Sequence, residues 1–275
     1  MPLSDIETTA LSEKARAIRM TVIEMLAEAG SGHTAGPLGM ADIFATLYFR
    51  TLVHDSTNPD WEGRDRLLLS NGHITPVRYA AMAHAGYFPV EECLTLRKFG
   101  SRLQGHPERT KLPGLETTSG PLGSGVSQAA GIALALAMDG KKNHVYCLMS
   151  DGELQEGNTW EGLMFAGKHH LPNLTAVIDR NNIQIDGTTE EVMPLEPLAD
   201  KFRAFNWHVI EVNGNDIPHV VSAFDEAKTI TEKPTMIIAH TTPGKGVPEI
   251  ENDYRWHGKA PSKEEAKRFL AALAT

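Results

Sequence analysis

Short apolar segments alternate with helical patterns along the second half of the chain, and this alternation limits the fold more than any other feature. Strand-like apolar runs occur at residues 145–149, 174–178, 208–212 and 235–239. Helical patterns precede or separate them at residues 126–138, 158–169 and 217–228. Strands that alternate with helices in this way pair in parallel through crossover connections. We therefore expect an α/β fold with a doubly wound, mostly parallel sheet flanked by helices.

The first half of the chain predicts further helices and one more strand. Apolar residues recur at helical spacing over residues 11–29, and Gly30 follows as a helix stop. Two more helices are expected at residues 37–53 and 76–85, and a strand is expected between them at residues 66–70. Ser262 and Glu265 form an S-x-x-E capping box, which predicts the start of a last helix. Without repeats or strong linkers, residues 1–275 are expected to form a single domain.

Charge and composition exclude several classes of protein. The chain has 26 Lys and Arg against 35 Asp and Glu, which argues against a nucleic-acid groove. Its two cysteines, Cys93 and Cys147, are too few for a disulfide scaffold and favour a reducing compartment. The longest apolar stretch, near residues 131–138, is too short to span a membrane, and no signal peptide is evident at the N-terminus. We expect a cytoplasmic protein.

Polar residues follow the predicted strands, at the sheet edge where open α/β folds bind ligands. Asp151 comes directly after residues 145–149, and Asn181 follows residues 174–178. Their oxygen atoms could bind one hard cation, Mg²⁺ or Ca²⁺. In the alternative interpretation, Asp151 only caps a helix and Asn181 is only a turn residue.

A glycine-rich segment at residues 119–125 leads into the helix expected at 126–138. Such a loop lets backbone N–H groups approach a phosphate at a helix N-terminus. Its spacing is G-x-x-G-x-G and no strand directly precedes it, which disfavours a Rossmann dinucleotide site. The segment Gly244-Lys245-Gly246 lacks the Ser or Thr of a P-loop, so an NTPase is also disfavoured.

Five histidines lie in predicted turns or at strand ends, where a site would gather them: His33, His73, His106, His240 and His257. Taken singly, each could instead be a solvated surface residue. His169 and His170 fall at a helix C-terminus, where imidazole suits the helix dipole without any functional role. No H-x-x-x-H or C-x-x-C spacing supports zinc catalysis.

Seven segments in order resemble the N-terminal, diphosphate-binding region of transketolases, which are thiamine diphosphate enzymes. These segments are SGHTAGPLGMAD (31–42), DRLLLSNGH (65–73), QGHPE (104–108), TTSGPLGSG (117–125), SDGELQEGNTWEG (150–162), IDRNNIQIDG (178–187) and YRWHGKAP (254–261). The similarity runs essentially from end to end of the chain.

The resemblance implies a role for each matching residue. Asp151, Asn181 and the Ile183 carbonyl would hold Mg²⁺, with Ca²⁺ as an alternative ion. Cofactor contacts would come from His73, Gly120, Leu122, Gly152, Asn181 and His240. His33, His106 and His257 would face the sugar as hydrogen-bond donors or proton shuttles, and Glu156 and Glu161 would join an acidic network between paired active sites.

Two departures from the family pattern matter. Ser150 stands where the family usually has glycine, but the metal-ligating Asp151 is kept. The sequence also stops after this region, without the pyrimidine-binding and C-terminal domains. We therefore expect the N-terminal subunit of a split transketolase, in a heterotetramer with a C-terminal subunit. The implied reaction transfers a two-carbon ketol unit from a ketose phosphate to an aldose phosphate in the pentose phosphate pathway.

Three alternatives stay open at the sequence level. The same enzyme class could act on an unusual ketose phosphate, or the chain could be a catalytically silent scaffold half. An NAD-dependent dehydrogenase is a more distant alternative. A deoxyxylulose-phosphate synthase is disfavoured by the YRWHGKAP segment at residues 254–261.

Overall fold

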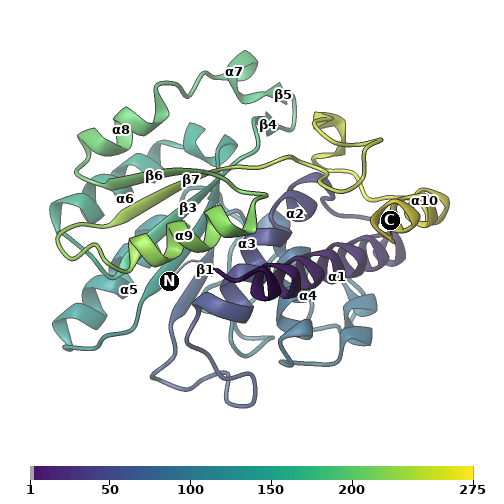
Figure 1. The fold of residues 1–275 in the computed structure, drawn as a ribbon, viewed down its shortest axis with the longest axis horizontal. Coiled ribbons are helices and arrows are strands. Elements are labelled where there is room, and N and C mark those ends of the chain that lie inside the picture. Colours follow the sequence, from purple (N-terminus) through teal and green to yellow (C-terminus); the bar gives the residue numbers. More distant parts are fainter. Residues whose placement is uncertain (1–2, 275) are drawn as a thin grey trace.

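Five parallel strands form the central sheet of the computed structural model, which describes residues 3–274 (Figure 1). The strands are β1 (Arg66–Leu69), β2 (Val145–Ser150), β3 (Leu174–Arg180), β6 (His208–Asn213) and β7 (Thr235–His240). Their order across the sheet is β1-β2-β3-β7-β6, and every neighbouring pair is parallel. The predicted fold class is confirmed. The four strands expected in the second half begin at the predicted residues and run one or two residues further.

Helices cover both faces of the sheet, as a doubly wound fold requires. One face carries α1 (Asp5–Ala29), α3 (Ala41–Thr46), α4 (Thr75–His84) and α9 (Ile217–Ala227), and the other carries α5 (Gly125–Met138), α6 (Gly157–Lys168) and α8 (Leu198–Ala204). The last helix, α10 (Lys263–Ala274), packs against α1. Side chains along β2 alternate between the faces: Tyr146 and Leu148 join one core, whereas Cys147 and Met149 join the other.

The helix expected over residues 37–53 is broken in the structure. It is replaced by α2 (Ala35–Gly39), α3 and a π-helical turn at Leu47–Thr51. Two carbonyl groups at the break are used by distant side chains: Arg19 Nε donates to Leu38 O at 2.9 Å, and Asn215 Nδ2 donates to Gly39 O at 2.8 Å. These contacts end the regular helical hydrogen-bond ladder, and the prediction of one continuous helix was wrong.

The ends of the chain show how local capping decides helix length. The first helix starts at Asp5, six residues before the predicted start, because Ser4 and Glu7 form a capping box. Residues 5–10 of this helix carry no apolar periodicity, so the hydrophobic pattern did not predict them as helical. The capping box predicted for the last helix is confirmed, since Glu265 N donates to Ser262 Oγ at 3.2 Å and Ser262 N donates to Glu265 Oε2 at 2.8 Å.

Several short elements that the sequence did not predict lie around the sheet. They are the hairpin of β4 (Ile183–Gln184) and β5 (Gly187–Thr188), helix α7 (Thr189–Val192), and 3-10 turns at Gly72–Ile74, Val90–Thr95, Gly152–Gln155 and Tyr254–Trp256. The hairpin and α7 lie directly after β3 and form an arm at the carboxyl edge of the sheet (Figure 1). We call residues 182–196 the arm.

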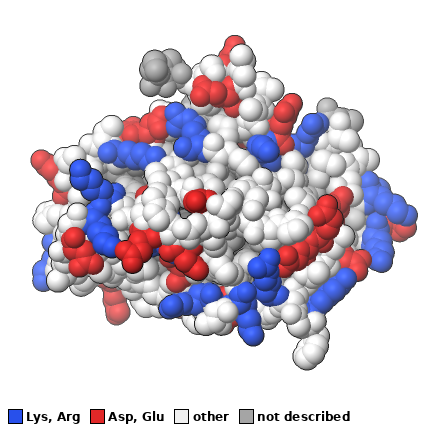
Figure 2. Space-filling view, turned by 90° about the horizontal axis from the view of Figure 1, so that it is seen from below, with Lys and Arg blue, Asp and Glu red and all other residues white. Residues whose placement is uncertain are grey.

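The surface shows no gathering of basic groups on the face in Figure 2. Blue and red side chains are interspersed around a mostly uncharged centre. Cys93 and Cys147 are buried and unbonded to each other. Within residues 3–274, no helix is both long and apolar enough to cross a membrane.

Candidate active site

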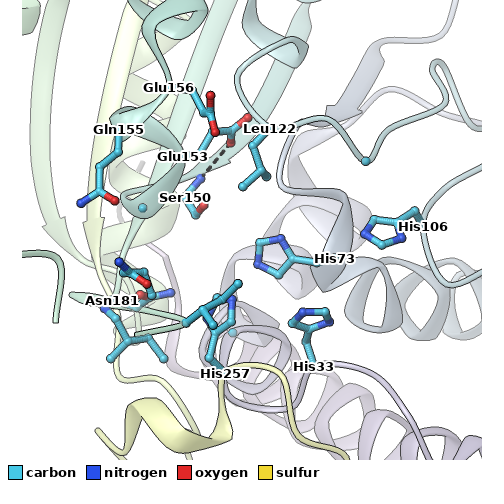
Figure 3. Close-up of a pocket in the computed structure, with 16 residues that line it drawn as sticks. His33, His73, His106, Leu122, Ser150, Glu153, Gln155, Glu156, Asn181 and His257 are labelled. Atoms are coloured by element: carbon cyan, nitrogen blue, oxygen red, sulfur yellow. Dashed lines mark hydrogen bonds between the residues drawn. The ribbon is translucent and has the colours of Figure 1, made fainter. Parts of the chain in front are cut away.

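A pocket of about 340 Å³ opens at the edge of the sheet where β1, β2 and β3 end (Figure 3). Segments from seven parts of the chain meet there: the loop that leads into α2, the turn after β1, the loop that carries His106, the glycine-rich loop, the end of β2 with the residues after it, the residues after β3 and the loop that carries His257. Its lining residues are His33, Gly36, His73, His106, Gly120, Leu122, Ser150, Gly152, Glu153, Gln155, Glu156, Asn181, Ile183, Gln184, Ile185 and His257. This is the edge at which open parallel sheets bind ligands.

Three imidazole rings pack against one another on one side of the pocket, and we call His33, His73 and His257 the histidine wall (Figure 3). The ring centroids lie 4.8 Å apart for His33 and His73, 5.4 Å for His33 and His257, and 5.2 Å for His73 and His257. Thr34 Oγ1 donates a 2.6 Å hydrogen bond to Lys259 O. This bond ties the loop that carries His33 to the loop that carries His257.

Burial makes the histidine wall electrically neutral. It lowers the pKa of His33 to about 4, with the charges of His257 and Arg97 acting in the same direction. Burial also lowers the pKa of His73 and of His257 below the usual value for imidazole. At neutral pH these rings can therefore donate one hydrogen bond and accept another. The Nδ1 atom of His33 is buried and has no hydrogen-bond partner in the protein.

The glycine-rich loop is fixed in place by a buried carboxylate, Glu153. Gly123 N donates to Glu153 Oε1 at 2.6 Å, and the Ser70 hydroxyl donates to the same oxygen. Gly125 N in turn donates to Ser70 Oγ at 3.0 Å. Gly123 has a φ of 83°, a left-handed conformation that favours glycine. These bonds hold the backbone of residues 119–125 against the ends of β1 and β2, with Gly120 and Leu122 lining the pocket.

Oxygen atoms of Asp151, Asn181 and Ile183 lie on the other side of the pocket, and we call this set the oxygen-donor corner. Ser150 and Asp179 pair across β2 and β3, so Asp151 and Asn181 follow adjacent strand ends. The Asp151 side chain is fully buried behind Gly152. A Cβ placed on Gly152 would lie 3.9 Å from Ile183 O, which puts this carbonyl beside the turn that follows β2.

Hydrogen bonds orient both side chains of the oxygen-donor corner. Gly152 N donates to Asp151 Oδ1 at 2.7 Å, and Asn182 N donates to Asp151 Oδ2 at 2.6 Å. Ile183 N donates to Asn181 Oδ1 at 3.0 Å. Burial nevertheless raises the pKa of Asp151 to about 6. A bound divalent cation would compensate this buried carboxylate, and carboxylate, amide and carbonyl oxygens are the ligands that Mg²⁺ and Ca²⁺ prefer.

Two residues that the sequence did not single out support this corner. Asn181 Nδ2 donates to Asp179 Oδ2 at 2.8 Å, and burial raises the pKa of Asp179 to about 7. Arg180 Nη1 donates to Asp151 Oδ2 at 3.1 Å and to Thr189 Oγ1 at 2.7 Å, which fastens the arm to the turn after β2. Glu153, Asp179 and Arg180 all lie within the resembling segments, but only the structure reveals their hydrogen bonds.

Ten of the predicted site residues line the pocket: His33, His73, His106, Gly120, Leu122, Gly152, Glu156, Asn181, Ile183 and His257. Asp151 lies directly behind them, whereas Glu161 is exposed on α6. The structure does not bring His240 to this pocket. Its exposed ring lies at the end of β7 with Nε2 3.4 Å from Glu211 Oε2 on neighbouring β6, in a separate surface hollow.

Comparison with known proteins gives a consistent result over almost the whole chain. The family described as "Transketolase, thiamine diphosphate binding domain" matches residues 11–273. The 6-deoxy-6-sulfo-D-fructose transketolase subunit of Clostridium sp. (strain MSTE9) is 43% identical over 263 residues, covering 96% of both chains. One of the subunits of apulose-4-phosphate transketolase from Phocaeicola vulgatus is 38% identical over 269 residues, covering 98% of this chain and 95% of the relative.

Solved structures show the same relationship at the level of the fold. Transketolase from Leishmania mexicana superimposes with a TM-score of 0.92 at 35% identity, covering 96% of this chain and 41% of that enzyme. The chain thus spans about two fifths of the length of this transketolase. Family match, subunit relatives and fold agree, and the chain belongs to the transketolase family as a thiamine diphosphate-binding domain.

Proposed function

We propose that this chain is the N-terminal, diphosphate-binding subunit of a thiamine diphosphate-dependent transketolase. With a separate C-terminal subunit, it would transfer a two-carbon ketol unit from a ketose phosphate to an aldose phosphate. The observation that carries this proposal is the meeting of the histidine wall and the oxygen-donor corner in one pocket. We place the reaction in cytoplasmic carbohydrate metabolism, with the pentose phosphate pathway as the first pathway to test.

The pocket fits the diphosphate end of the cofactor. Buried polar atoms without a protein partner lie on its loops: His33 Nδ1, Ser119 Oγ and both amide atoms of Asn71. Asp151, Asn181 and the Ile183 carbonyl would hold Mg²⁺, while His73, Gly152 and the backbone of Gly120 and Leu122 would contact the diphosphate. When bound, thiamine diphosphate supplies the carbon nucleophile and electron sink that cleave the carbon–carbon bond of a ketose.

The remaining histidines fit the sugar. His33, His106 and His257 line the pocket, and the pKa of each is lowered, chiefly by burial. A neutral imidazole can accept a proton from a sugar hydroxyl and can donate a hydrogen bond to a carbonyl oxygen. Glu156 lies at the N-terminus of α6 on the pocket rim, where it would join the acidic network between paired active sites.

The relatives support a separate partner chain. Two proteins named as transketolase subunits match this chain over 96% and 95% of their own lengths. We infer that a second polypeptide contributes the pyrimidine-binding and C-terminal domains, in a heterotetramer with two copies of each chain. The names of these relatives include a sulfo-sugar and a sugar phosphate other than xylulose 5-phosphate, which favours testing unusual donors alongside the common one.

The direct test is affinity purification of this chain from its own cells, followed by an assay of the purified complex. Transfer from xylulose 5-phosphate, 6-deoxy-6-sulfo-fructose or apulose 4-phosphate to ribose 5-phosphate is measured with and without thiamine diphosphate and Mg²⁺. We expect a co-purifying polypeptide and cofactor-dependent transfer from at least one donor.

Three other outcomes of this assay would each contradict a different part of the proposed function. Robust transfer by the isolated chain would contradict the need for a partner. A partner without transfer from any donor would leave the cofactor site but remove the sugar assignment. Absence of both partner and transfer would favour a silent scaffold.

A further inference from the structure

A short stretch of backbone, residues 117–122, brings Gly120 and Leu122 to the pocket, and we call it the lining segment. A buried carboxylate stands at each end of it. Beyond its carboxyl end, the backbone donates a hydrogen bond to Glu153, as described above. Directly before its amino end lies Glu116, whose side chain is only 10% exposed. The position of the lining segment therefore depends on what holds Glu116.

Three arginines act on Glu116. Arg64 Nη2 donates to Glu116 Oε2 at 3.0 Å, and Arg66 Nε lies 3.6 Å from the same oxygen. Arg78 is buried on α4 and donates from Nη2 to Gly114 O at 3.3 Å, two residues before Glu116. Burial raises the pKa of Glu116, and the charges of the three guanidinium groups counteract this effect. The carboxylate is thus bound by guanidinium groups rather than by solvent.

The arginines themselves are fixed to the first strand of the sheet. Arg66 is the first residue of β1, and its Nη2 donates to Glu62 O at 3.1 Å. Arg78 Nη2 donates to Leu67 O at 2.9 Å, also on β1. Through these bonds, the chain just before the lining segment is fastened to β1 and α4, two regular elements of the fold.

The lining segment also holds the loop that carries His106. Ser119 N donates to Pro107 O at 3.1 Å, directly after His106. One residue before Ser119, Thr118 Oγ1 accepts a 3.2 Å hydrogen bond from Arg109 N. A displaced lining segment would therefore move His106 as well as its own backbone.

We infer that Glu116 is a positioning residue, which holds the lining segment and the His106 loop in the geometry that the pocket needs. Glu116 does not line the pocket, so it acts through the backbone of Gly120 and Leu122. Charge-assisted hydrogen bonds to guanidinium groups are short and specific in geometry, which suits this role. The inference rests on the proposed function, since it assigns a task in the same pocket.

The test measures the affinity of the purified two-subunit complex for thiamine diphosphate, with Mg²⁺ present. Glu116→Gln keeps the size of the side chain and removes its charge. We expect the dissociation constant to rise about tenfold, the lower end of the range for residues that orient ligands from outside the binding shell. Arg64→Met removes the partner at 3.0 Å and should give a smaller rise, and it carries the test if Glu116→Gln does not fold.

Asp65→Asn is the matched control. Asp65 is a partly buried carboxylate at the same end of β1, where it accepts hydrogen bonds from Val53 N at 3.0 Å and from His144 N at 2.8 Å. Neither of these residues lines the pocket. The control should therefore lower the free energy of unfolding and leave the affinity for the cofactor unchanged.

Hydrogen exchange of the backbone amides measures the lining segment directly, without any ligand. In Glu116→Gln, the amides of residues 117–122 should exchange about tenfold faster than in the wild type, because local opening of this stretch becomes easier. In Asp65→Asn they should exchange as in the wild type.

The outcomes separate this inference from the proposed function. Equal losses of cofactor affinity in Glu116→Gln and Asp65→Asn would overturn it, because Glu116 would then act only on global stability. Unchanged affinity in Glu116→Gln, or in Arg64→Met if the first variant does not fold, would overturn it as well. If the wild-type complex does not bind thiamine diphosphate, the proposed function fails. Hydrogen exchange then still decides: faster exchange of residues 117–122 in Glu116→Gln alone supports the positioning role, and equal exchange in all variants overturns it.

Discussion

Hydrogen bonds hold the oxygen-donor corner of the pocket, whereas packing holds the histidine wall. Both oxygens of the Asp151 carboxylate accept backbone N–H groups, and Asn181 is bonded to Asp179 and to Ile183 N. The imidazoles of the histidine wall instead pack against one another in tilted and edge-on arrangements, and His33 Nδ1 has no hydrogen-bond partner in the protein. The two sides therefore differ in what they need from a ligand.

Under the proposed function, this difference would match a division of tasks between the two sides of the pocket. A metal ion and a diphosphate must be bound in one geometry, and hydrogen-bonded ligands provide that geometry in advance. A sugar that changes its bonding during the reaction needs donors and acceptors that are free to form new bonds. The unsatisfied imidazole nitrogen of His33 provides such a group, and burial keeps it uncharged.

The largest effect is expected from breaking the oxygen-donor corner. Asp151→Ala would remove one metal ligand and leave two backbone N–H groups and Arg180 without their acceptor. We expect the affinity of the complex for thiamine diphosphate in the presence of Mg²⁺ to fall by about a hundredfold or more. Fluorescence titration of the complex with cofactor measures this affinity. Asp186→Ala, an exposed residue of the same arm, is the matched control, and unchanged affinity in Asp151→Ala would remove Asp151 from the metal site.

A smaller loss is expected from Glu153→Gln, which tests the support of the glycine-rich loop. Glutamine keeps one oxygen that can accept the hydrogen bonds from Gly123 N and the Ser70 hydroxyl, which now go to Oε1. Its amide nitrogen cannot accept the hydrogen bond that Ser150 N now donates to Oε2. One buried donor would stay unpaired, at a cost of about 1–3 kcal/mol in the free energy of unfolding. Urea denaturation measures this value. Glu161→Gln, on the exposed face of α6, should stay within about 0.5 kcal/mol of the wild type, and equal stability of both variants would show that Glu153 does not hold the loop.

The parts of the structure that the sequence predicts are those with a periodic or motif signal. Strand ends that carry Asp151 and Asn181 follow from the apolar runs and from the rule for parallel sheets. The helix break after Gly39 does not follow from such a signal, because the side chains of Arg19 and Asn215, which are distant in the sequence, bind the carbonyl groups at the break. No local pattern contains these contacts.

The same reasoning applies within the pocket. His33, His73 and His257 come from three separate loops, and their resemblance to a known family predicted their meeting where spacing alone could not. The sequence missed the supporting roles of Glu153, Asp179 and Arg180, since their hydrogen bonds join segments that are distant in the sequence and have no local pattern. The sequence also leaves the place of His240 open, because the position after a strand does not determine whether the side chain faces the pocket or the neighbouring Glu211, beside which the ring lies in the structure.

The smallest effect is expected on the histidine wall, through the pH dependence of stability. The pKa of His33 is lowered to about 4 in the folded chain, so between about pH 6.5 and pH 4 the unfolded chain binds more protons at this residue. Stability contributed by neutral His33 is therefore lost as pH falls through this window. In His33→Gln this loss is absent, whereas acidic groups such as Asp151 titrate in both proteins and cancel in the comparison.

Urea denaturation at pH 7 and pH 5 measures this difference. From pH 7 to pH 5, the wild type should lose about 1–2 kcal/mol of unfolding free energy more than His33→Gln. His170→Gln, at an exposed position away from the pocket, should follow the wild type. A parallel decline in all three proteins would mean that burial does not keep His33 neutral. His33 would then be partly protonated near neutral pH, and the contrast between a neutral histidine wall and the hydrogen-bonded oxygen-donor corner would be weaker.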